Sequence, residues 1–191
     1  LLRRRFGAKV VFDVKSFQVF VDDIRRHGGE PIMWKTGHSH LKRKMREDGI
    51  LLGDEVSGHM FFAENWYGVA DGILASCKFL DLVSRSPELV SGHFDTLPHL
   101  HATPKLKAPC PDEQKFQVVA DLALEFKACY ETVDIDGARI LFPEGWGLVR
   151  ASNTNPYLTP RFEARTRAAL EEMKRVVYDA LRRYPYVTLP E

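Results

Sequence analysis

Lys9-Val-Val-Phe-Asp13 decides the fold of the first half of the chain, because a short β-branched run that closes on a carboxylate is typical of a buried strand. From Ser16 to His27 the apolar residues recur at helical spacing, and Gly28-Gly29 ends the expected helix. A second strand is expected at Pro31–Trp34. A strand, a helix and a strand in succession predict an α/β layer fold with a mostly parallel sheet.

The same alternation continues to about residue 84. A basic amphipathic helix that ends near Asp48 precedes a strand at Ile50–Leu52, and Met60–Phe62 is typical of a further strand. A helix is then expected at Gly68–Ser84, and its candidate core residues are Ile73, Leu74, Cys77, Leu80 and Leu82. The first domain is therefore predicted to be α/β, with a mixed, mostly parallel sheet and flanking helices.

The composition changes over residues 86–111, where prolines and polar residues replace the periodic pattern. We place the domain boundary near Ser91, which gives a first domain at residues 1–90 and a second at residues 91–191.

The second domain is predicted to be a smaller α+β unit with an antiparallel sheet and helices. Pro111-Asp112-Glu113 opens a helix that extends to about Tyr130, and its apolar positions are Phe116, Val119, Leu122, Leu124 and Phe126. Strands are expected at Thr132–Asp134, Ala138–Phe142, Trp146–Arg150 and Pro160–Ala164, followed by a helix at Arg165–Arg183. A helix, short strands and a helix in this order favour the α+β class.

The bulk composition excludes several classes of protein. A formal net charge of +1 over 191 residues gives no reason to expect nucleic acid or an acidic membrane as a partner. No apolar run approaches the ~20 residues of a membrane-spanning helix. Cys77, Cys110 and Cys129 have no CxxC spacing, so we expect no disulfide framework, no metal site and a reducing, cytoplasmic compartment.

Polar side chains follow the predicted strands of the first domain. Lys15, His38 and the loop Glu55-Val-Ser-Gly-His59 each come just past a strand end, on the edge where open α/β sheets bind ligands. A carboxylate accepts hydrogen bonds from two neighbouring hydroxyls, and glycine lets the backbone approach closely, so the loop suits a sugar. The alternative is an ordinary polar turn with a solvated lysine nearby.

Arg150-Ala-Ser-Asn-Thr-Asn-Pro156 gathers an arginine, two hydroxyls and two amides after a strand-like run. A guanidinium offers a planar fork of donors, and the short polar side chains add donors whose positions the backbone fixes. This cluster suits a dianion such as a phosphate monoester, and Arg161 supplies a second positive charge. The alternative is again a polar turn, since these are common turn residues.

Taken together, these motifs resemble the α-D-phosphohexomutases, and most closely their phosphomannomutase/phosphoglucomutase branch, over nearly the whole chain. The matching stretches, in the order of the family, are Phe12–Lys15, Met33–Ser39, Glu55–His59, Pro109–Glu113 and Arg150–Thr154. Within the sugar loop, Asp54 stands where the commoner family pattern has a glycine, and Val56 stands where it has a methionine.

The resemblance implies a role for each motif. Family members have four domains, and this chain resembles the third and fourth. Glu55 and Ser57 would hold the hexose hydroxyls, with His59 in the same loop, and Lys15 and His38 would line the centre of the cleft as catalytic residues near the transferred phosphoryl group. The residues expected to hold the unreactive phosphate are Arg150, Ser152, Asn153, Thr154 and Arg161.

The resemblance also implies parts that this sequence lacks. It has no Ser-His-Asn-Pro stretch for a phosphorylated nucleophile and no Asp-Gly-Asp-Gly-Asp loop for Mg²⁺, which family members carry in their first two domains. The chain begins without methionine, so we expect it to be the carboxyl-terminal half of a longer enzyme and to be catalytically silent by itself.

The expected enzyme is an isomerase that interconverts hexose 1- and 6-phosphates of mannose or glucose, with a hexose 1,6-bisphosphate as intermediate and the missing amino-terminal domains as partners. A phosphosugar-binding module without chemistry is the main alternative. A nucleic-acid-binding domain that uses its basic helices is a second one, which the near-neutral charge disfavours.

Overall fold

The computed structural model describes residues 2 and 5–190, and the chain divides into two compact units, Leu1–Pro98 and His99–Glu191. The boundary expected near Ser91 falls inside the short helix α4 (Val90–Asp95), whereas the contacts divide the chain after Pro98. The composition changes from residue 86, before the division between the two units, because α4 contributes no buried residue among those described.

The first unit contains a mixed sheet with strand order β2-β1-β3-β4-β5. Strand β1 pairs in parallel with β2 and with β3, while β4 pairs antiparallel with β3 and with β5. The bounds of these strands are β1 (Lys9–Asp13), β2 (Glu30–Trp34), β3 (Leu52–Asp54), β4 (Met60–Phe62) and β5 (Val69–Ala70). The predicted α/β class with a mixed sheet is confirmed, and its parallel part is β2-β1-β3.

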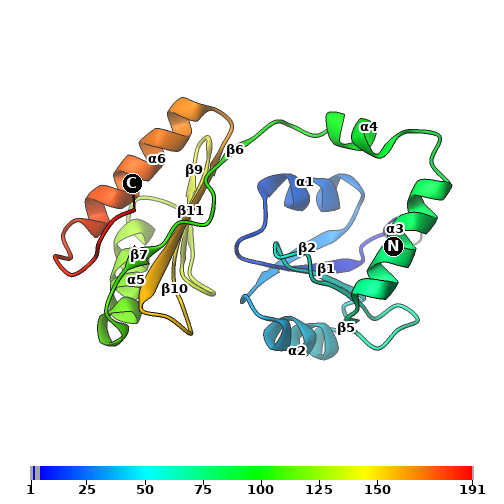
Figure 1. Ribbon diagram of the computed structural model, residues 1–191, viewed down its shortest axis with the longest axis horizontal. Helices are drawn as coiled ribbons and strands as arrows, with labels where there is room; N and C mark the ends of the chain where they lie inside the picture. Colours follow the sequence, from blue (N-terminus) through cyan, green and yellow to red (C-terminus); the bar gives the residue numbers. More distant parts are fainter. Residues whose placement is uncertain (1, 3–4, 191) are drawn as a thin grey trace. The chain divides into compact units, whose positions relative to one another are not determined.

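The two helices α1 (Gln18–Arg26) and α2 (His38–Asp48) cover opposite faces of this sheet (Figure 1). Side chains alternate across a strand, so neighbours in β1 enter different cores. Val10 and Phe12 pack in a cluster with residues of α1, whereas Val11 packs with Leu41 and Met45 of α2. The β-branched run that predicted the first strand is therefore buried from both sides.

Helix α3 (Gly72–Ser84) forms where a helix was predicted, but it does not enter the core. None of its residues, all of which the structure describes, is buried, and Ile73 and Leu80 are 81% and 64% exposed. The prediction that Ile73, Leu74, Cys77, Leu80 and Leu82 are core residues is therefore wrong for this chain. Composition indicated burial, but burial requires a surface to pack against, and the described residues of this unit cover α3 only in part, so that Leu74 is half-buried.

The second unit is built on an antiparallel sheet with the order β6-β11-β10-β9-β8, in which β7 also pairs with β11. Its strands are β6 (His101–Ala102), β7 (Ala108–Pro109), β8 (Thr132–Val133), β9 (Ala138–Phe142), β10 (Gly145–Ala151) and β11 (Tyr157–Ala164). Helices α5 (Asp112–Lys127) and α6 (Arg167–Leu181) flank the sheet (Figure 1). The α+β class predicted for this half is confirmed.

The core of the second unit lies between the two helices and one face of the sheet. Val118, Leu122 and Phe126 of α5 pack in one cluster with Val177 and Leu181 of α6 and with alternate residues of β9, β10 and β11. Val119, Leu122 and Phe126 are buried as predicted, but Phe116 and Leu124 are exposed. These two lie beside the buried stripe of α5 and not on it.

Leu41 of α2 provides a test of the first core. Leu41→Ala removes a fully buried side chain that packs with Val11, so it should lower the free energy of unfolding of the first unit by roughly 3 kcal/mol. Amide hydrogen exchange of β1 in the whole chain measures this change. The matched control is Leu80→Ala on α3, which should change it by less than about 0.5 kcal/mol. Equal losses in the two variants would show that Leu80 is also a core residue.

Candidate functional site

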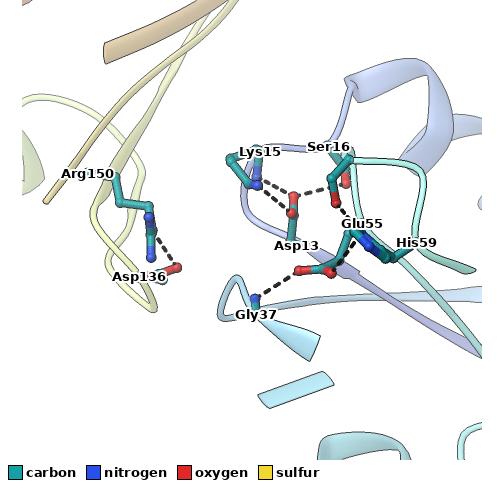
Figure 2. Close-up of polar contacts among 9 residues, drawn as sticks. Asp13, Lys15, Ser16, Gly37, Glu55, His59, Asp136 and Arg150 are labelled. Carbon is teal, nitrogen blue, oxygen red and sulfur yellow. Dashed lines mark hydrogen bonds and ion pairs between the residues drawn. The ribbon is translucent and has the colours of Figure 1, made fainter. Parts of the chain in front are cut away.

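The loops that follow β1, β2 and β3 meet at one edge of the first sheet (Figure 2). Glu55, which follows β3, is buried, and its Oε1 accepts a hydrogen bond of 2.9 Å from the backbone N–H of Gly37, which follows β2. Gly37 has a φ of +123°, a conformation that side chains strongly disfavour. This hydrogen bond joins the two strand-end loops.

The loop from Glu55 to His59 is a tight turn that gathers the three residues predicted to bind sugar. The N–H of Glu55 donates to the carbonyl of His59 at 3.0 Å, and the N–H of Gly58 donates to the carbonyl of Glu55 at 2.8 Å. The Ser57 hydroxyl lies 2.8 Å from His59 Nδ1, which is 3.7 Å from Glu55 Oε2. A buried carboxylate, a hydroxyl and an exposed imidazole thus share one small surface, where they can exchange hydrogen bonds with hydroxyl groups.

Lys15 is held at the same edge by a buried carboxylate. Its Nζ lies 3.0 Å from Oδ2 of Asp13, and its backbone N–H donates to Oδ1 of Asp13 at 2.9 Å. Ser16 donates from its hydroxyl to the same Oδ1 at 3.4 Å. Asp13 was identified from the sequence only as a strand end, although a carboxylate directly after a buried apolar run is the signal that marks it.

His38 is the first residue of α2 and is exposed. It follows Gly37 directly, so it lies beside the Glu55–Gly37 hydrogen bond in sequence and at the same edge of the sheet. The structure therefore places the predicted Lys15, His38 and Glu55 just beyond the ends of neighbouring strands of the first unit.

Asp54 introduces a third carboxyl at this edge. It ends β3 and pairs in register with Phe12 of the neighbouring strand. Burial, together with the nearby carboxylates of Asp13 and Glu55, raises the pKa of Asp54 to about 7. At neutral pH this carboxyl is therefore partly protonated, which relieves the repulsion between it and its two acidic neighbours.

The Asp54 proton links the stability of the first unit to pH. The folded state binds this proton more tightly than the unfolded chain does, so its contribution to stability is greatest below the ordinary pKa of 3.8 and falls as the pH rises to about 7. Asp54→Asn should remove that decline, which solvent screening limits to the order of 1 kcal/mol.

Unfolding of the first unit, followed from pH 5 to pH 8 by hydrogen exchange of β1, measures the effect. Asp95→Asn on α4 removes an exposed carboxyl and should follow the wild-type profile. A wild-type chain whose pH profile matches that of Asp54→Asn would refute the assignment.

In the second unit, the strand pair β10–β11 carries both predicted phosphate-binding arginines. Arg150 pairs with Thr159, and Leu148 pairs with Arg161. Cross-strand partners and residues two apart share a face, so Arg150 and Arg161 lie on the same face of the sheet. This is the face opposite Val149 and the helices.

The loop between β10 and β11 contains the other three predicted phosphate ligands. Ser152 is buried, its N–H donates to the carbonyl of Tyr157 at 3.1 Å, and its hydroxyl accepts from the N–H of Thr154 at 3.4 Å. Asn153 and Thr154 are exposed. The loop is a structured polar turn with accessible donors at its tip. This geometry fits both an ordinary polar turn and the predicted phosphate site.

Two contacts from outside this loop fix its shape, and sequence reasoning missed one of them. Lys115 of α5 is buried, and its Nζ donates to the carbonyl of Asn155 at 3.0 Å and to Asp112 at 2.5 Å. The N–H of Cys110 donates to the carbonyl of Pro156 at 3.0 Å. The stretch Pro109–Glu113, recognised as a motif, therefore supports the polar loop, whereas nothing in the sequence pointed to Lys115.

Arg150 itself is paired with Asp136, which the sequence analysis also missed. Arg150 Nε donates to Oδ2 of Asp136 at 2.8 Å (Figure 2). Asp136 lies in the turn before β9, between two strands that the sequence predicted.

The described residues contain no group of three or more His, Cys, Asp or Glu side chains placed to hold a metal ion. Cys77, Cys110 and Cys129 are unpaired thiols. No helix in the described part of the chain has the length and apolar character to span a bilayer.

Comparisons with known proteins agree with these motifs. A family model described as phosphoglucomutase/phosphomannomutase, alpha/beta/alpha domain III, matches residues 2–100, and one described as the C-terminal domain of the same family matches residues 106–180. The phosphomannomutase/phosphoglucomutase of Pseudomonas syringae pv. tomato is 42% identical over 194 residues, covering 100% of this chain and 41% of that protein. The phosphoglucomutase of Neisseria gonorrhoeae is 43% identical over 193 residues, covering 100% of this chain and 42% of that protein.

Solved structures show the same relationship. A crystal structure of a phosphoglucomutase/phosphomannomutase family protein from Burkholderia thailandensis is 38% identical, with a TM-score of 0.88 over 100% of this chain and 41% of that chain. An N-acetylphosphoglucosamine mutase from Aspergillus fumigatus shares the fold, with a TM-score of 0.64 at 14% identity over 94% of this chain and 44% of that chain. This chain spans about two fifths of the length of the curated relatives named above. The resemblance stated from the motifs is confirmed: the chain belongs to the phosphoglucomutase/phosphomannomutase family and contains its third and carboxyl-terminal domains.

Proposed function

We propose that this chain is the substrate-binding carboxyl-terminal half of a phosphohexomutase that interconverts hexose 1-phosphate and hexose 6-phosphate. The observation that carries the proposal is that a loop with a buried carboxylate at Glu55 and an arginine-bearing polar loop at Arg150 occur in one chain of this family. Its relatives are named for phosphoglucomutase and phosphomannomutase activities. Both glucose and mannose phosphates are candidate substrates.

The hexose would be held by the loop from Glu55 to His59. Oε1 of Glu55 already accepts the Gly37 N–H, but each carboxylate oxygen has two lone pairs, so Glu55 still accepts hydrogen bonds from sugar hydroxyls. Ser57 and His59 add one hydroxyl and one ring nitrogen beside it. Because the loop is closed by its own backbone hydrogen bonds, it orients the sugar with little loss of conformational entropy on binding.

The phosphate that does not react would be held by the second unit. Arg150 and Arg161 present guanidinium donors on one face of β10–β11, and Ser152, Asn153 and Thr154 provide short donors in the adjoining loop. Bonds between guanidinium and phosphate are charge-assisted and bidentate, which gives both affinity and orientation. While one end of the substrate gains or loses a phosphoryl group, such an anchor keeps the other end in place.

Lys15 and His38 are the residues that we assign near the transferred phosphoryl group. Lys15 brings a cationic ammonium to the strand-end edge, where it stabilises developing negative charge. His38 brings an imidazole, whose ring nitrogens can donate or accept a proton. Mg²⁺ would neutralise phosphoryl charge in the complete enzyme, but the described residues do not form a ligand set for it, so we assign no step of this chain to the metal.

Further domains of the enzyme are the partners that we propose for this chain, and they would supply the phosphoserine and the metal ligands. Helix α3 supports this, because a helix that is apolar nearly all round is normally buried. Here most of its large apolar side chains are exposed, together with Leu89 and Phe94 of the following segment. We propose that the family's preceding domains cover this surface. The unpaired thiols are consistent with a reducing compartment such as the cytoplasm.

A phosphosugar-binding module without chemistry is the second candidate. In that role the loops at Glu55 and Arg150 would bind a phosphosugar without any transfer of a phosphoryl group. Mutase activity of the longer polypeptide, or of this chain joined to the first two domains of the Pseudomonas syringae relative, separates the two candidates.

Binding of glucose 1-phosphate and mannose 1-phosphate to this chain tests the assigned loops. Arg150→Ala should weaken binding of both sugars by a factor of about 10 to 100, because it removes charge-assisted hydrogen bonds to phosphate. Glu55→Ala should weaken binding of the sugar phosphates while leaving the weak binding of inorganic phosphate unchanged. Calorimetric titration or chemical-shift perturbation measures both.

The matched controls are Arg175→Ala on α6 and Glu88→Gln, which remove exposed charges of the same sign far from these loops in sequence. Both should bind like the wild type. If Arg150→Ala and Glu55→Ala also bind like the wild type, the roles assigned to the two loops are wrong.

A further inference from the structure

The guanidinium of Arg150 is held by a carboxylate from a different hairpin. Its Nε donates to Oδ2 of Asp136 at 2.8 Å, and the two side chains are only 12% and 18% exposed. Both residues lie in the second unit, Arg150 on β10 and Asp136 in the turn between β8 and β9. The contact therefore joins the predicted phosphate-binding strand to a turn that carries no predicted ligand.

The backbone of this turn packs directly on Arg150. Gly137 has a φ of +107°, and a Cβ atom there would lie 2.7 Å from the carbonyl oxygen of Val149 and 3.1 Å from Cβ of Arg150. A side chain at this position would therefore push the turn away from β10. Glycine allows Asp136 to sit close enough to reach the Nε of Arg150, and the adjacent pairing of Ala138 with Val149 fixes the register.

We propose that Asp136 is a positioning residue that orients the Arg150 guanidinium for a phosphate group. The proposal rests on the proposed function, in which Arg150 binds the phosphate of the substrate. A guanidinium has five N–H donors, and the bond to Asp136 uses the one on Nε. With Nε used in this way, a parallel fork with two phosphate oxygens can form at the two terminal nitrogens.

The orienting effect of Asp136 on Arg150 and the negative charge of Asp136 should change the affinity for phosphate in opposite directions. An arginine side chain has several rotatable bonds, and fixing it before the ligand arrives removes part of the entropic cost of binding. The carboxylate, however, also cancels part of the attraction between Arg150 and a dianion. We infer that orientation prevails, because both partners are largely buried and the turn is built to bring them together.

Titration of the whole 191-residue chain with glucose 1-phosphate tests this inference. Asp136→Ala should weaken binding about tenfold, and Asp136→Asn should lie between it and the wild type, because an amide oxygen still accepts from Nε without carrying the charge. The matched control is Asp134→Ala, which removes an exposed carboxylate from the same connection between strands, where it pairs with Lys127. It should bind like the wild type.

The Nε–Hε resonance of Arg150 in the NMR spectrum of each variant provides a readout that folding does not mimic. Its exchange with water should be slow in the wild type and in Asp134→Ala, and should accelerate in Asp136→Ala. Backbone amide spectra identify any variant that has lost its fold, and Asp136→Asn then remains as the milder change.

The possible outcomes separate the two proposals. Equal or tighter binding of glucose 1-phosphate by Asp136→Ala would overturn the positioning role, as would an unchanged Hε exchange rate. A wild-type chain that does not bind glucose 1-phosphate would count against the proposed function. In that case the Hε exchange rates alone decide whether Asp136 orders the Arg150 side chain.

Discussion

The parallel pairing of β1 with both β2 and β3 is the constraint on which the site in the first unit depends. Parallel strands end at the same edge of their sheet, so Lys15, Gly37 and Glu55 meet there although they are far apart in sequence. The hydrogen bond from the Gly37 N–H to the buried Glu55 carboxylate then joins two of the three loops. A buried carboxylate without a donor is costly, so this bond stabilises both loop conformations at once.

Glycine has the same part in both of these loops, since Gly37 and Gly58 have φ values of +123° and +87° and each directly precedes a histidine. At Gly37 the unusual conformation accompanies the N–H bond to Glu55, and at Gly58 it closes the turn on the carbonyl of Glu55. The residues of the candidate site are therefore placed by backbone geometry, which a side chain at either glycine would strain.

Secondary-structure elements that depend on the local residue pattern could be predicted from the sequence. Contacts between residues far apart in the chain could not. The strand at Lys9–Asp13 could be predicted because its apolar run is buried on both faces, which leaves a clear signal. Helix α3 misled the same reasoning, because apolar composition reports a tendency to be buried and not the presence of a covering surface. Asp136 and Lys115 were missed because their partners in the segment proposed to bind phosphate lie 14 and 40 residues away, and neither stands in a pattern that a single sequence reveals.

Two of the cations that the proposed function assigns to a phosphate are already paired with a carboxylate, Lys15 with Asp13 and Arg150 with Asp136. A cationic side chain that is largely removed from water needs a counter-charge, and the carboxylate provides it before the ligand arrives. Each pair is then close to neutral, so attraction at long range is weak and recognition depends on the direction of the remaining N–H donors. On the proposed function, a chain with a formal net charge of +1 would therefore recognise a dianion through oriented hydrogen bonds and not through a basic surface.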